Sequence, residues 1–173
     1  MKEPISIASF SSISSLGNSS RSVWNSYLNP NHFLATKDFG KFSAPVSAIS
    51  DILNKEVEAF RDSDSKYKNL DRSVLLAMYV SRRALEKVSW DQSFGVNIGS
   101  SRGATELFEK YYDAFQSDPF GRTETLTSPT TTLGNIASWV AHDLQTNPGR
   151  HTARGAAAHS RRHVSTHEYM HAG

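Results

Sequence analysis

The chain has 173 residues, no cysteine and a formal net charge of +2 at pH 7. This length fits one domain with a real core, and no apolar run approaches the roughly 18 residues of a membrane-spanning helix. The lack of cysteine excludes disulfides, thiolate metal sites and a cysteine nucleophile.

The charge is unevenly distributed along the chain. Residues 1–145 carry 15 Lys and Arg against 16 Asp and Glu, and residues 146–173 carry four Arg against one Glu, so the balances are −1 and +3. Nucleic-acid binding needs basic residues gathered on a folded face, which the body does not provide, so we expect no nucleic-acid partner. The first residues are too polar for a secretory signal, and we expect a cytoplasmic protein.

The N-terminal quarter predicts two elements. Residues 5–13 (ISIASFSSI) partly alternate and favour a first strand, which the turn at Leu16-Gly17 ends. A helix follows at residues 20–28, because serines can cap it and four apolar residues share one face. From there to about Gly40 the sequence indicates irregular structure.

The next segments predict an edge strand and a short helix. Residues 41–49 (KFSAPVSAI) favour a strand, and Pro45 indicates a sheet edge because proline cannot donate to a ladder. Asp51 to about Arg61 favours a helix, and residues 62–69 (DSDSKYKN) read as a polar loop.

A longer helix, a strand and another helix come next. Asp71 can cap a helix that runs to about Val88 with apolar residues at a 3.6 period. An apolar strand then leads into the turn Gly99–Gly103, which precedes a helix at residues 104–116. Helix N-terminal amides at this turn could hold an anion, but the P-loop and dinucleotide patterns are absent. We therefore interpret the turn as a tight connection.

Residues 117–128 form a predicted loop, and Ser128–Gln145 is a loop feeding an amphipathic helix. Thr130–Thr132 can cap this helix, whose apolar stripe has helical spacing. Its members are Leu133, Ile136, Ala137, Val140 and Leu144. Strands separated by long helices predict an α/β fold with crossover connections.

The last 28 residues, 146–173, differ from the rest. They contain no Leu, Ile, Phe, Trp or Lys, yet they hold five of the seven histidines. Such a composition cannot build a core, so we expect either a disordered tail or sequence translated out of frame. The chain then divides into a domain at 1–145 and this Arg/His/Ala-rich tail.

Two patterns suggest chemistry. Ser138 and His142 lie one helical turn apart beside Asp143, but an acid adjacent to the base on the same helix points elsewhere, so we interpret them as surface residues. His167, Glu168 and His171 match HExxH, the zinc-hydrolase pattern. A catalytic zinc site needs a buried helix and supporting partners, which the tail composition cannot supply. We therefore assign no metal, cofactor-binding or catalytic residue, and keep zinc capture by this tail as an alternative.

Two stretches resemble a known family. Residues 94–115 (FGVNIGSSRGATELFEKYYDAF) and 127–144 (TSPTTTLGNIASWVAHDL) are similar to the N-terminal half of a β-ketoacyl synthase, the acyltransferase that condenses acyl-carrier-protein thioesters in fatty-acid and polyketide-type synthesis. The resemblance covers roughly residues 4–145. It implies an incomplete N-terminal half of the thiolase-like fold, a layered sheet with covering helices.

In that family the helix matched by Leu133–Gln145 precedes a Gly-Pro turn and a buried strand that presents the nucleophilic cysteine, and two histidines follow later. Here the match ends at about Gln145, with no cysteine after it. The resemblance therefore implies a truncated, inactive synthase, with acyl-carrier protein and a second synthase subunit as partners. The alternative is a non-catalytic protein that docks on an intact condensing enzyme.

Overall fold

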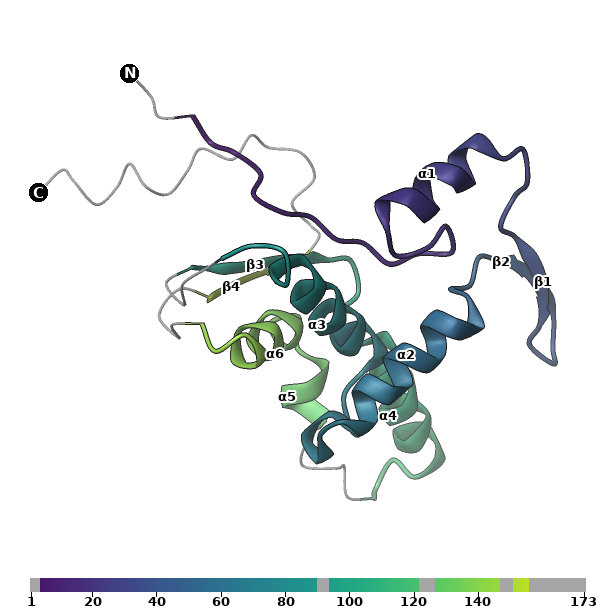
Figure 1. Ribbon diagram of the computed structural model, residues 1–173. Coiled ribbons are helices and arrows are strands. Elements are labelled where there is room, and N and C mark those ends of the chain that lie inside the picture. The colour runs from purple at the N-terminus through teal and green to yellow at the C-terminus, as the bar shows by residue number, and fades with distance from the viewer. Residues whose placement is uncertain (1–3, 90–93, 122–126, 147–150, 156–173) are drawn as a thin grey trace, which may run out of the picture.

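The computed structural model describes residues 4–89, 94–121 and 127–146, and the backbone of 151–155. The chain is a mixed α/β protein (Figure 1). Its elements are α1 (Ser20–Leu28), β1 (Ala35–Asp38), β2 (Ser43–Val46), α2 (Asp51–Asp62), the 3-10 turn η1 (Ser65–Tyr67), α3 (Arg72–Leu85), β3 (Val96–Ser100), α4 (Thr105–Ser117), α5 (Thr127–Thr131), α6 (Asn135–Asp143) and β4 (His151–Gly155).

The core lies where α2, η1, α3, β3 and α6 meet. The apolar stripe predicted for α6 is confirmed, apart from the exposed Leu133. The face predicted for α3 is also confirmed at Val74, Leu75 and Met78, which are fully buried. The core cluster consists of Val57, Tyr67, Leu70, Val74, Leu75, Met78, Val96, Ile136, Ala137, Val140, Ala141 and Leu144.

The described strands form two small sheets. β1 and β2 pair antiparallel, with Thr36 opposite Pro45, so the edge position predicted from this proline is confirmed. β1 itself lies in the stretch that the sequence indicates as irregular. β3 and β4 pair in parallel, with Val96 opposite His151, and the helices α4, α5 and α6 lie between them in the chain. Parallel strands need such a crossover connection.

The predicted first strand is wrong. Residues 4–13 belong to no strand, and Ile5 and Ile7 are exposed. Alternation favours a strand only where a neighbouring strand can pair with it, and within the described residues this segment instead runs past α3. There the Ser9 hydroxyl donates to the carbonyl of Ala84 at 2.6 Å.

The threonine caps predicted for α6 are also wrong. Its N-cap is Gly134, which makes no side-chain cap bond. The hydroxyls of Thr131 and Thr132 instead donate to carbonyls of Thr127 and Pro129 at 2.7 and 3.2 Å, because the preceding residues form the short helix α5. None of the described helices is long and apolar enough to cross a membrane.

Candidate functional site

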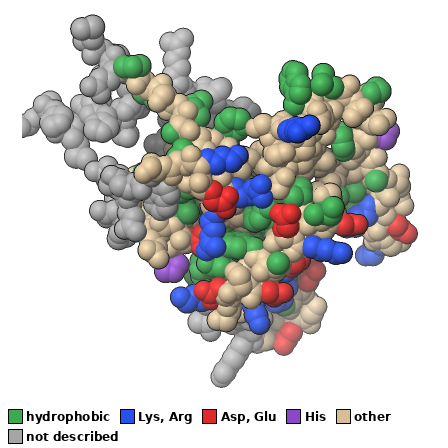
Figure 2. Space-filling model, in the orientation of Figure 1, with side chains coloured by type: hydrophobic (Ala, Val, Ile, Leu, Met, Phe, Trp, Pro, Cys, Tyr) green, Lys and Arg blue, Asp and Glu red, His purple; other side chains and the backbone are tan. Residues whose placement is uncertain are grey.

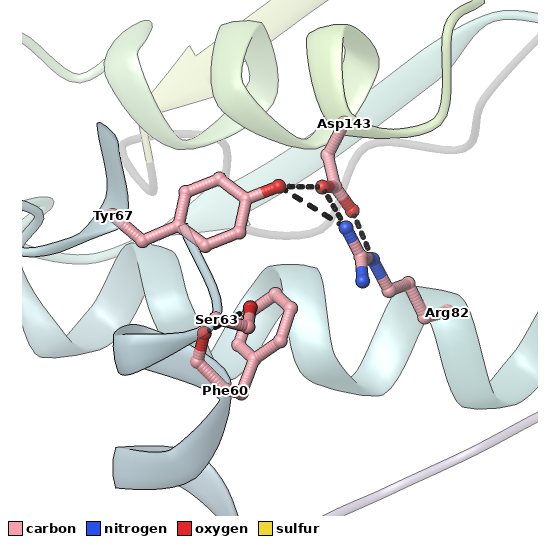
Figure 3. A network of polar contacts seen from close by, with 5 residues as sticks. All are labelled: Phe60, Ser63, Tyr67, Arg82 and Asp143. Atoms are coloured by element: carbon pink, nitrogen blue, oxygen red, sulfur yellow. Dashed lines mark hydrogen bonds and ion pairs between the residues drawn. The ribbon is translucent and has the colours of Figure 1, made fainter. Parts of the chain in front are cut away.

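A polar cluster joins three segments through Tyr67, Arg82 and Asp143 (Figure 3). Arg82 binds the carboxylate of Asp143 with two parallel hydrogen bonds, from Nε to Oδ2 at 2.8 Å and from Nη2 to Oδ1 at 2.6 Å. The Tyr67 hydroxyl donates to the same Oδ1 at 2.7 Å and accepts from Arg82 Nη2 at 3.1 Å. The cluster therefore ties η1, α3 and α6 together.

Burial and charge set the electrostatics of this cluster. The side chain of Asp143 is 1% exposed, whereas that of Arg82 is 44% exposed. Burial, followed by the hydrogen bond to Asp143, raises the pKa of the Tyr67 hydroxyl. The hydrogen bond to Asp143 likewise raises the pKa of the Arg82 guanidinium. The Cζ atom of the Arg82 guanidinium also lies 4.8 Å from the centre of the Phe60 ring, so the ring covers one planar face of the guanidinium.

A pocket of about 660 Å³ opens beside the cluster and is lined partly by Lys66, Ser138 and His142. The cluster itself is poorly suited to acid–base chemistry. Tyr67 is protonated at neutral pH, because its pKa lies above 10.0, and both carboxylate oxygens of Asp143 already accept hydrogen bonds. This arrangement stabilises the packing of α6 on α3 and presents no activated nucleophile to the pocket.

The surface interpretation is confirmed for Ser138 and His142, whose side chains are exposed, and is wrong for Asp143, whose side chain is 1% exposed because it packs against Arg82 and Tyr67. His142 meets the ring of Trp139 edge-on at 5.9 Å. Asp143 points toward Arg82 rather than His142, as expected for neighbouring positions on one helix. The three residues therefore do not form a triad.

The turn at Gly99–Gly103 is a tight connection, as the sequence predicts. Gly103 has a φ of +69°, which favours glycine, and its amide donates to the Ser100 hydroxyl at 2.9 Å. The first turn of α4 is already bound to a carboxylate of the protein itself, since the Leu107 amide donates to Oδ2 of Asp71 at 3.1 Å. Asp71, 2% exposed, also caps α3 through the amide of Ser73 at 2.8 Å.

The HExxH residues His167, Glu168 and His171 lie outside the described residues. In the part of the chain that the structure describes, no three His, Asp or Glu side chains gather in a way that could hold a metal ion. Zinc capture by the tail thus stays a prediction.

Sequence reasoning missed the cluster. Tyr67 falls in a segment that reads as a polar loop, yet it is buried, and it is the only aromatic residue of that loop. Arg82 and Asp143 each lie on a helix that was predicted, but 61 positions apart. An isolated tyrosine in a polar loop was the one available signal, and pairing it with its partners requires the tertiary fold.

The chain is thus a mixed α/β protein in which the ion pair between Arg82 and Asp143 connects helix α6 to helix α3. No protein-family model matches the chain, and no curated protein matches it.

Proposed function

We propose that residues 4–145 are the N-terminal portion of a β-ketoacyl-synthase-like domain, and that the chain itself carries out no condensation. The observation that carries this proposal is the order of elements after residue 94. The strand β3, the glycine turn and the helix α4 are followed by the short helix α5 and then by α6. These elements fall on the two stretches that carry the resemblance, residues 94–115 and 127–144.

The chemistry of condensation supports the second half of the proposal. In the family reaction, an acyl group passes from a carrier-protein thioester to an enzyme thiolate. The thiolate then leaves when the acyl group forms a new carbon–carbon bond. This chain contains no cysteine, and the strand β4 has the sequence HTARG. Ser138, which lines the pocket beside the cluster, is exposed.

Intact-mass spectrometry tests this proposal. The purified chain is incubated with acyl-carrier protein loaded with an acyl thioester, and an active β-ketoacyl synthase serves as the positive control. We expect an acyl adduct on the control and no mass increase on this chain. An acyl group that stays on this chain after denaturation would contradict the proposal, and peptide mapping would then identify its residue.

A second candidate function is that of a non-catalytic partner that docks on an intact condensing enzyme. The supporting observation is an aromatic row on α4 that no described element covers. Phe108, Tyr112 and Phe115 lie at helical spacing and are all exposed, with the rings of Phe108 and Tyr112 stacked at 6.5 Å. Exposed aromatic rows of this kind are typical of interaction surfaces.

Sedimentation of the chain with and without an intact synthase tests this second candidate. We expect a complex with the synthase, and about a tenfold loss of affinity in the double variant Phe108→Ser/Tyr112→Ser, because each ring contributes apolar area. Phe120→Ser is the matched control, since Phe120 is fully exposed and lies beyond the row. A monodisperse monomer that does not bind the synthase would contradict the docking function.

A further inference from the structure

The β1–β2 hairpin ends in an exposed pair of phenylalanines. The rings of Phe39 and Phe42 stack with their centres 5.2 Å apart, and the two residues are 47% and 63% exposed. The turn is closed by a hydrogen bond from the amide of Phe39 to the carbonyl of Phe42 at 2.9 Å. Gly40 between them has a φ of +81°, which lets the chain reverse tightly. The aromatic pair is therefore held in place by the backbone of the turn.

The hairpin lies at the edge of the molecule, away from α3 and α6 (Figure 1). All four residues of β1 are exposed, and the alternate residues Ser43 and Pro45 of β2 are exposed as well. Within the described residues, no buried core side chain comes from this hairpin. Its aromatic pair consequently contributes little to the core, and the cost of exposing it to water is not offset by packing there.

Two lysines lie close to the aromatic pair in the chain. The ammonium of Lys37 lies 5.4 Å from the centre of the Phe39 ring, and Lys41 lies between Gly40 and Phe42 in the chain. Neither lysine forms an ion pair with another described residue. The nearby acid, Asp38, uses one carboxylate oxygen to accept from the Gly40 amide at 2.8 Å. Figure 2 shows basic, acidic and hydrophobic side chains near one another at this edge.

We propose that this hairpin tip, residues 37–42, binds the surface of a membrane that contains anionic lipids. Aromatic side chains enter the boundary between headgroups and acyl chains, and neighbouring lysines are attracted to anionic headgroups. The tip combines both features within six residues, on a projecting element with few contacts to the core. A protein that binds in this way lies on the bilayer surface, so it does not require a membrane-spanning helix.

Charge complementarity selects an anionic bilayer over a neutral one. The tip carries two lysines against one aspartate, and that aspartate is partly engaged in the turn. An uncharged bilayer would offer the phenylalanines the same apolar boundary but no partner for the lysines. The attraction to anionic headgroups also weakens with salt, because exposed charges are screened.

Vesicle flotation of the full chain tests this proposal. Vesicles of phosphatidylcholine alone are compared with an equal mixture of phosphatidylcholine and phosphatidylglycerol, each at low and high salt. We expect binding to the anionic vesicles only, and weaker binding at high salt. The affinity should fall about fivefold for each lysine replaced in Lys37→Gln/Lys41→Gln. It should fall about tenfold in Phe39→Ser/Phe42→Ser.

Phe120→Ser serves as the matched control for the aromatic pair, because Phe120 is fully exposed on a different segment. It should bind the anionic vesicles as the unchanged chain does. Three results would overturn the proposal: no flotation of the unchanged chain, equal flotation with neutral vesicles, or an equal loss in the Phe120 variant. An apparent loss caused by misfolding is excluded by circular dichroism of each variant.

A fluorescent probe gives a second measurement that leaves the tip residues unchanged. The chain has no cysteine, so Ser43→Cys carries a single environment-sensitive label beside the tip. Ser65→Cys, at an exposed position of η1, is the matched control. Anionic vesicles should brighten the label at position 43 and leave the one at position 65 unchanged. Equal responses at the two positions would contradict docking through the hairpin.

Discussion

Asp143 is the residue at which three segments of the chain meet. Its buried carboxylate accepts two hydrogen bonds from Arg82 and one from Tyr67. A carboxylate with a planar guanidinium makes a strong, directional pair. Arg82 remains 44% exposed, so it can regain water when its partner is lost, whereas Tyr67 is largely buried and cannot.

Asp143→Ala should lower the free energy of unfolding by about 2 kcal/mol, because charged hydrogen bonds are lost while the arginine is rehydrated. Urea denaturation followed by circular dichroism measures this change. Asp113→Ala is the control, since Asp113 is exposed on α4, and it should change stability by less than about 0.5 kcal/mol. Equal effects of the two substitutions would show that the cluster does not stabilise the fold.

The ionisation of Tyr67 makes the free energy of unfolding depend on pH in the alkaline range. Burial and the bond to Asp143 raise its pKa in the folded chain above the ordinary value of 10.0. Its contribution is therefore complete below pH 10 and is lost as the pH rises through the folded-state pKa. Tyr67→Phe should reduce the loss of stability between pH 9 and 11, measured by urea denaturation at each pH.

Burial also raises the pKa of Tyr79, so the Tyr67→Phe variant should keep part of the alkaline loss. Tyr112→Phe, on the exposed face of α4, should keep the dependence of the unchanged chain. An unchanged slope in Tyr67→Phe would mean that Tyr67 ionises equally in the folded and unfolded chain.

At the scale of elements, one buried carboxylate organises two helices. Asp71 caps α3 through the amide of Ser73 and accepts from the amide of Leu107 in the first turn of α4. Both acceptors face helix N-termini, where the helix dipole favours negative charge. The capping of α3 was predictable from the sequence, because Asp71 directly precedes an apolar period. The bond to α4 was not, since it spans 36 positions.

Asp71→Ala should destabilise the chain by about 2 kcal/mol through the loss of a cap and of the bond to α4. Asp71→Asn should cost about half as much, because one oxygen can still accept from Ser73. Thermal or urea denaturation separates these variants. Asp64→Ala, which removes the cap of the short η1, is the matched control and should have the smallest effect. The same loss in the Asn and Ala variants would show that the retained bond to Ser73 contributes nothing, and no loss in the Asn variant would show that the bond to α4 contributes nothing.

Elements with local signals were predicted well. α2, α3, β3 and α4 carry their caps, periods or apolar runs within a few residues, and the structure confirms them at nearly the expected bounds. Strands without such a local signal were not predicted. Residues 5–13 have a strand pattern without a pairing strand, whereas β1 and β4 form because a neighbour lies alongside them. Neither a partner nor its register is encoded within a short window.

The cluster, too, depends on long-range structure. The periodicity of α3 and α6 predicted which faces enter the core, but not which polar residues flank that contact. Arg82 and Asp143 meet only after the two helices pack together. The thiolase-like arrangement stays a prediction, since the described strands form two separate pairs.

At the scale of the whole molecule, stability is concentrated in one part of the chain. Within the described residues, every buried apolar side chain lies between Leu53 and Leu144. α1 contributes none, and the hairpin projects beside it. Local opening should therefore cost little in residues 20–46 and nearly the full free energy of unfolding in α3 and α6.

Hydrogen exchange measured by mass spectrometry checks this division. Peptides from α3 and α6 should exchange at least about a hundredfold more slowly than peptides from α1 and the hairpin. Anionic vesicles should slow exchange in residues 37–42 alone, because bilayer contact shields the tip without adding to the core. Equal protection of α1 and α3 without vesicles would mean that the N-terminal segment unfolds together with the core, and the hairpin would then be a part of the cooperative fold.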